Sequence, residues 1–109
     1  MHLSASTIIN DSVSNSSGDD LGKIEDLMID TQTGNVDYAV VSFGGFLGIG
    51  NKLFAVPLQA MQVDTKNKQF LLNESKEHLK NAPGFDKDDW PRSPDPEYSM
   101  QVRKYYRVV

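Results

Sequence analysis

Two apolar segments on either side of a short turn sequence constrain the fold most strongly. Residues 23–30, KIEDLMID, mix alternation with a run of three apolar residues, and residues 36–43, VDYAVVSF, are rich in β-branched and aromatic side chains. Between them, Asp30 can accept backbone N–H bonds and Gly34 can take a positive φ. We therefore expect a β-hairpin whose first strand carries a bulge or a bend.

Shorter apolar runs predict further strands. The expected segments are residues 7–9, 52–58, 61–64 and 69–73, with TKNK as the turn between the last two. Pro57 cannot donate a ladder hydrogen bond, so it should end its strand or lie on an edge. A short helix is expected over residues 75–84, because Ser75 can serve as N-cap and Pro83-Gly84 can stop it.

The character of the chain changes after residue 85. FDKDDWPRSPDPE is rich in proline and acids and should lie along the surface or act as a linker. Beyond it, Tyr98, Val102, Tyr105 and Val109 fall on one helical stripe, although a strand is also compatible with the last residues.

Four glycines between residues 44 and 50 resemble a phosphate-binding loop at first sight. A Walker loop requires lysine directly after the last glycine, but Asn51 stands there and Lys52 comes one residue late. Both common phosphate motifs also need a following helix, whereas KLFAV is typical of a strand. We interpret the segment as a strand connection whose apolar side chains either plug the core or form a contact patch. Those side chains are Phe46, Leu47 and Ile49.

Catalytic and metal-binding chemistry has little support in the sequence. There is no cysteine, so thiolate metal sites, cysteine nucleophiles and disulfides are excluded. The acids Asp86, Asp88 and Asp89 do not continue into a calcium-loop pattern. The chain has two histidines and no G-x-S-x-G motif. We therefore expect no enzyme and nominate no catalytic, metal or cofactor residue.

Length and charge limit the remaining classes of function. The 109 residues suit one domain, and no apolar run approaches the length of a membrane helix. The first residues lack the features of a secretory signal, so we expect a cytoplasmic protein without membrane insertion. The net charge of −4 makes direct nucleic-acid binding unfavourable, although RKYYR at 103–107 mixes basic and aromatic residues as some RNA-binding segments do. The alternative is that these cations lie near a helix C-terminus and the tyrosines pack on the domain.

The central block, residues 21–58, carries turn and strand signals in a specific order. They are Gly22-Lys23-Ile24, Asp30, Thr33-Gly34, Tyr38 to Val41, Gly44 to Gly50, and Lys52 to Pro57. This order resembles the PRC-barrel family, and the similarity extends over roughly residues 5–80. APGFDKDDWP and the aromatic tail also look like the ends of free-standing bacterial members.

The resemblance implies a mainly β fold. We expect a small antiparallel β-barrel of about six strands over residues 1–82. Residues 83–109 would form an extension, with a proline-rich linker and a short helix that packs on the barrel or on a partner subunit.

The resemblance also implies binding rather than catalysis. Related domains occur in the H subunit of the purple-bacterial photosynthetic reaction centre and in a ribosome maturation factor. We expect the chain to differ from both, since the sequence predicts neither a membrane anchor nor a preceding domain.

We therefore expect a non-catalytic protein-interaction or assembly module that forms a homodimer. The alternatives are a small-ligand or metal-binding barrel and, by analogy only, an RNA-processing or ribosome-associated accessory protein. Aromatic side chains are enriched at interaction hot spots. The candidate interaction residues are Phe46, Leu47, Ile49, Trp90, Tyr98, Tyr105 and Tyr106.

Overall fold

The expected hairpin lies at the centre of the structure, a computed structural model that describes residues 2–43, 52–91 and 96–108. β2 (Asp20–Asp30) and β3 (Asn35–Phe43) pair antiparallel, and their register shifts twice along β2, which confirms the predicted irregularity. At the turn, the Asp30 carboxylate accepts the backbone N–H of Gln32 at 2.9 Å, and Gly34 has a φ of +81°. The local turn chemistry therefore fixes the hairpin as predicted.

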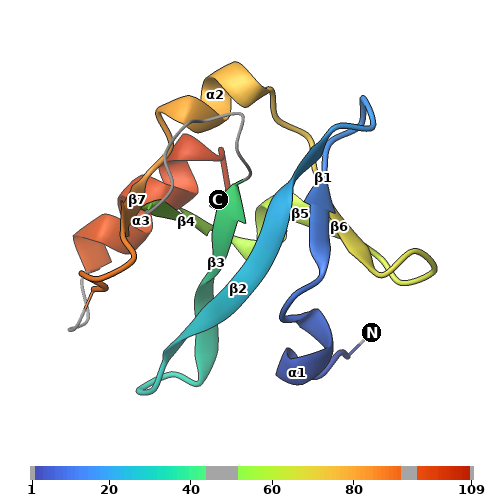
Figure 1. Cartoon of the computed structure of the whole chain (residues 1–109). Helices are drawn as coiled ribbons and strands as arrows, with labels where there is room; N and C mark the ends of the chain where they lie inside the picture. The colour runs from blue at the N-terminus through green and yellow to red at the C-terminus, as the bar shows by residue number, and fades with distance from the viewer. Residues whose placement is uncertain (1, 44–51, 92–95, 109) are drawn as a thin grey trace.

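The other strands extend this hairpin into one sheet. Their order is β5-β6-β1-β2-β3-β4-β7, and the sheet is not closed within the described residues (Figure 1). All neighbouring strands are antiparallel except β1 and β6, which run parallel. The mainly β fold is thus confirmed, with seven strands in the described part of the chain. The added strands are β1 (Ser12–Ser14), β4 (Lys52–Val56), β5 (Met61–Asp64), β6 (Gln69–Leu72) and β7 (Gly84–Asp86).

The helices are short. They are α1 (Ala5–Ile8), the 3₁₀ turn η2 (Leu58–Ala60), α2 (Lys76–Lys80) and α3 (Pro96–Tyr105). Two predictions are confirmed: Pro57 ends β4, and the Ser75 hydroxyl caps α2 by accepting the N–H of His78 at 3.1 Å. The β-branched run at 7–9 is instead part of a helical turn, because the Ser4 hydroxyl accepts the N–H of Thr7 and starts a helix there.

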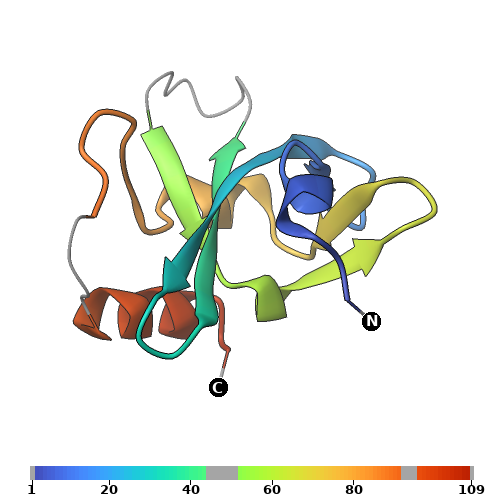
Figure 2. The same ribbon diagram turned by 90° about the horizontal axis from the view of Figure 1, so that it is seen from below.

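The core requires cover on both faces of β3 and β4. Residues 38–41 and 53–56 are buried without interruption. In a strand with one face exposed to solvent, buried and exposed residues would alternate. In Figures 1 and 2, β5 and β6 lie on one side of these strands and α3 lies on the other. Val102 and Tyr106 of the C-terminal segment belong to the same core cluster as the sheet residues. α3 is therefore a second layer on the sheet.

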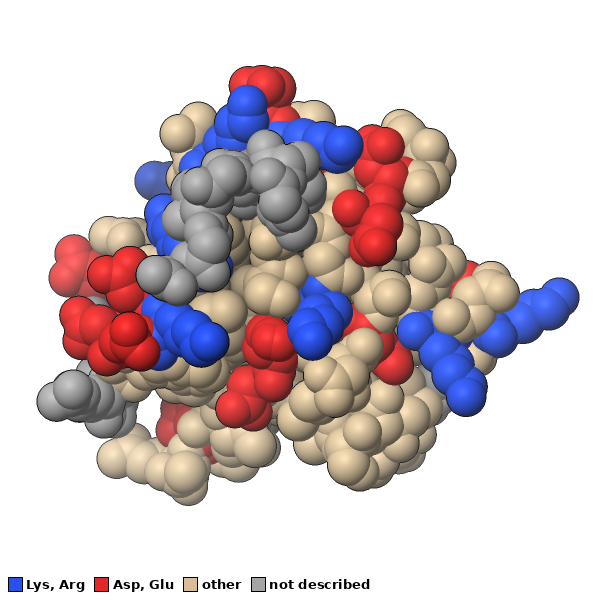
Figure 3. Space-filling model, in the orientation of Figure 1, with Lys and Arg blue, Asp and Glu red and all other residues tan. Residues whose placement is uncertain are grey.

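The surface carries charges of both signs. Lys and Arg side chains are interspersed with Asp and Glu on the face seen in Figure 3. Within the described ranges, no helix is long and apolar enough to cross a membrane.

Gly22 offers a test of the sheet geometry, because a Cβ at this position would collide with the backbone carbonyl oxygen of Ser42 on β3. We expect Gly22→Ala to lower the free energy of unfolding by about 2–3 kcal/mol, measured by urea denaturation. The neighbouring exposed substitution Lys23→Ala should change it by less than about 0.5 kcal/mol. Equal effects of the two substitutions would contradict the close approach of β2 and β3.

Candidate interaction surface on the C-terminal helix

The sequence around α3 favours a helix at both ends. Pro96 occupies the first helical position, where its missing N–H is not needed, and Glu97 lies in the first turn. Arg103 and Lys104 lie in the last turn, where cations interact favourably with the helix dipole. The sequence is compatible with a helix or a strand for the last residues, and the structure has a helix there.

The inner face of α3 is aromatic and packs on the sheet. The Tyr98 ring meets the Tyr38 ring of β3 edge to face, with centroids 6.0 Å apart. One turn later Val102 is completely buried, and Tyr106 is only 5% exposed. The Ser99 hydroxyl lies 3.4 Å from the Asp37 carboxylate, so a polar contact also ties the helix to β3.

Two tyrosines at the end of the helix differ in how their hydroxyls are satisfied. The Tyr105 ring stacks on the His78 ring of α2 at 4.3 Å, and its hydroxyl donates to the His78 carbonyl. The buried Tyr106 hydroxyl has no hydrogen-bond partner in the described part of the chain. Burial raises the pKa of Tyr106 far above its ordinary value, and Tyr105 and Glu74 add to the rise. Tyr106 is therefore a neutral core residue that carries an unsatisfied polar group.

The candidate aromatic residues thus contact their own chain. Trp90 packs on Phe85 with ring centroids 5.2 Å apart, and its indole N–H donates to the Lys87 carbonyl at 2.7 Å. Tyr98 and Tyr105 are also partly buried, and both pack against the core of their own chain. A contact of these side chains with a partner stays a prediction. The other candidates, Phe46, Leu47 and Ile49, lie outside the described residues.

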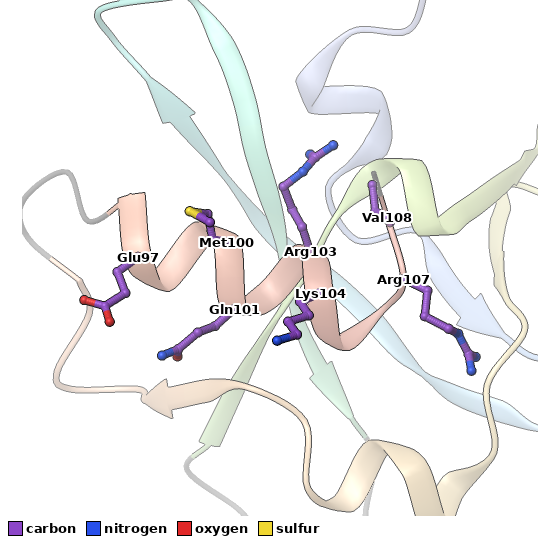
Figure 4. A pocket seen from close by; sticks show the side chains of 7 residues that line it. All are labelled: Glu97, Met100, Gln101, Arg103, Lys104, Arg107 and Val108. Atoms are coloured by element: carbon purple, nitrogen blue, oxygen red, sulfur yellow. The ribbon is translucent and has the colours of Figure 1, made fainter.

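The outer face of α3 forms an open groove whose lining includes none of the candidate interaction residues predicted from the sequence. We call this surface the α3 groove, and atoms of apolar character make up most of its lining. Met100 is its most exposed apolar side chain, at 70%. The signal was present in the sequence, because Met100 falls off the aromatic stripe of the helix. The residues that line the groove are Glu97, Met100, Gln101, Arg103, Lys104, Arg107 and Val108 (Figure 4).

The groove ends at an unusual helix terminus. Arg107 comes after α3 with a φ of +57°, a left-handed conformation that favours glycine. The N–H of Val108 reaches back to the Arg103 carbonyl at 2.8 Å, and the N–H of Arg107 to that of Lys104 at 3.1 Å, as in a Schellman motif. The Arg107 guanidinium lies 3.4 Å from the Glu74 carboxylate while 77% of the side chain stays exposed. Such an exposed ion pair contributes little to stability.

A second hollow, of about 490 Å³, lies between the start of β3, η2 and α3. Its lining is mainly polar and includes Asp37 and Ser99, which contact each other, and Arg103. In the described part of the chain, no three His, Asp or Glu side chains are grouped as a metal site would require. The alternative function, a small-ligand or metal-binding barrel, stays a prediction.

Comparison with known proteins agrees with this architecture. The family model of the PRC-barrel domain matches residues 1–79. No curated protein matches the chain at a significant level. The match includes β1 to β6 and most of α2, whereas β7, Trp90 and α3 come after it in the chain.

The two neighbouring tyrosines allow a matched test of the packing of α3. Tyr106→Phe removes an unsatisfied buried hydroxyl, so we expect the free energy of unfolding to rise by about 1 kcal/mol. Tyr105→Phe leaves the His78 carbonyl without its donor, and we expect a loss of about 1 kcal/mol. Urea denaturation of both variants measures the difference. A loss of stability in Tyr106→Phe would show that its hydroxyl is satisfied.

Alkaline pH gives an independent test. The folded-state pKa values of Tyr98, Tyr105 and Tyr106 are raised by burial, while an unfolded tyrosine titrates near pH 10. The associated stability is therefore fully present below about pH 10 and is lost as the pH rises toward the folded-state pKa values. We expect the unfolding midpoint to fall steeply above about pH 10, and less steeply in Tyr106→Phe. Identical slopes would contradict the burial of Tyr106.

Proposed function

Because this chain belongs to the PRC-barrel domain family, we propose that it is a non-catalytic protein-binding module that assembles as a homodimer. The observation that carries the proposal is the α3 groove. The helix uses its aromatic face to complete the domain core, which leaves its opposite face available for a partner.

The groove has the properties expected of a protein-binding surface. Its apolar surface consists of Met100, Val108 and the aliphatic stems of the long polar side chains, and an exposed apolar surface with a polar rim can mark an interaction site. Met100 supplies a flexible, polarisable side chain of the kind that adapts to a partner. Long polar side chains flank it along the helix, so the apolar centre has a charged rim.

Self-association is supported by a different part of the fold, the edge strand β5. In the described part of the chain, β5 pairs only with β6, so its other side can hydrogen-bond to another strand. Gln62 and Val63 of β5 are exposed. Two copies of β5 can pair antiparallel about a two-fold axis, which is the commonest symmetry of soluble oligomers.

The absence of catalysis rests on the family resemblance, which implies binding domains without shared catalytic residues. A cytoplasmic location also belongs to the proposal and rests on the sequence alone. Cell fractionation tests the location.

Light scattering tests the dimer. We expect a mass twice that of the 12.2 kDa chain at micromolar concentration. Val63→Lys should shift the protein toward the monomer, because it places two like charges close to the two-fold axis of a β5 pair. The matched control is Ile29→Lys at another exposed apolar position, which should leave the mass unchanged. A monomeric wild-type protein would refute the dimer, and a dimeric Val63→Lys would refute β5 as its contact.

A further inference from the structure

We propose that the α3 groove binds an acidic amphipathic segment of a different protein. The apolar side chains of that segment would pack on Met100 and Val108, and its carboxylates would pair with Lys104 and Arg107. The inference rests on the proposed function, because it names the class of partner that the binding module takes.

Charge complementarity indicates an acidic partner. The groove is lined by three cationic side chains and one carboxylate, so its lining residues sum to +2, and Glu74 beside Arg107 lowers the local charge to +1. The whole chain carries −4, and the remainder of the chain therefore carries −6. Figure 4 shows Glu97 at the start of α3 and Arg107 just past its end, so the positive charge is concentrated toward the C-terminal end. That end attracts an acidic segment and repels a basic one.

The same charge argues against a second copy of this chain in the groove. A two-fold contact would place this surface against itself, since an isologous interface uses the same patch on both subunits. Two positively charged surfaces would then face each other. The groove and the proposed β5 contact are therefore separate surfaces, and a dimer can present two grooves.

A nucleic acid fits the groove less well than a peptide does. Single-stranded nucleic acids bind through exposed aromatic rings combined with cations. Here Tyr106 is buried and the Tyr105 ring stacks on His78, so these rings face their own domain. The lining of the groove is mostly apolar, which suits side chains such as Leu or Met better than phosphates.

The conformation of Arg107 is a second, independent observation. At the left-handed position that ends the helix, glycine would be the favoured residue, yet the chain has arginine there. Its guanidinium reaches the Glu74 carboxylate but stays largely exposed, with further donors for another carboxylate. Residues that break a local rule tend to mark functional positions. The Arg107 backbone closes the helix end, while its exposed guanidinium is placed to bind a partner.

The test is a titration of the isotopically labelled full chain, monitored by NMR chemical shifts. The probe is a synthetic amphipathic helical peptide with leucines on one face and glutamates beside them. The control peptide has the same sequence with lysine in place of each glutamate, and a single-stranded RNA oligonucleotide forms a third arm. We expect the acidic peptide alone to shift signals of Met100, Gln101, Lys104 and Arg107. Equal binding of both peptides, no binding of the acidic one, or shifts only with RNA would overturn the proposal.

Three variants and one matched control make the test specific. Lys104→Glu combined with Arg107→Glu should weaken binding of the acidic peptide by about ten-fold, and Met100→Ala should weaken it by about five-fold. The matched control is Lys66→Glu combined with Lys87→Glu, which changes the same charge at exposed positions outside the groove and should leave binding unchanged. Arg107→Gly should bind more weakly while folding at least as stably, which separates a binding role from a structural one. Equal loss in the control pair would show that only the overall charge matters.

Failure of this inference is distinguishable from failure of the proposed function. If light scattering finds a dimer while the acidic peptide does not bind, the assembly module stands and the groove assignment is wrong. If the chain is monomeric while the acidic peptide binds the groove, the dimer is wrong and the protein-binding role stands.

Discussion

The fold depends on burying both faces of the paired strands β3 and β4. Their central residues are apolar without alternation, so neither face can be left to water. β5 and β6 lie on one side of these strands, and α3, which follows the family match over residues 1–79, lies on the other. α3 covers its side through Val102, and Tyr106 directly after the helix also joins the core. Burying a large apolar side chain contributes about 1.5–3 kcal/mol, so this helix is part of the stability of the domain.

This constraint divides the helix into two faces with different roles. The inner face is fixed by packing, with Tyr98 on Tyr38 and Tyr105 on His78. A partner that reached these aromatic rings would have to lift the helix from the sheet. On the outer face only Val108 packs against the core, and the other side chains that line the groove are long and polar or, like Met100, flexible. The groove can therefore change its contacts without loss of the core, as a recognition surface on a rigid support should.

Much of the β fold could be predicted because turns and strand composition are local signals. Asp30, Gly34 and Ser75 act within a few residues of the chain, and each is found in its expected role. The strand predicted at 7–9 is wrong, because strand propensity is weak where a cap at Ser4 can start a helical turn. The side that the C-terminal tyrosines face could not be predicted, since tyrosine suits both cores and interfaces. The unbroken apolar runs of β3 and β4 were the signal that a second layer had to cover the sheet.

Two residues at the end of α3 are poor choices for stability alone. Tyr106 buries a hydroxyl without a partner in the described part of the chain, and Arg107 adopts a backbone conformation that glycine would take more easily. They are adjacent, and one faces the core while the other faces the groove. A chain selected only to hold α3 on the sheet would gain from Phe at the first position and Gly at the second. That both occur together indicates that the end of α3 is selected for more than stability. The exposed guanidinium of Arg107 is the group that a partner could bind.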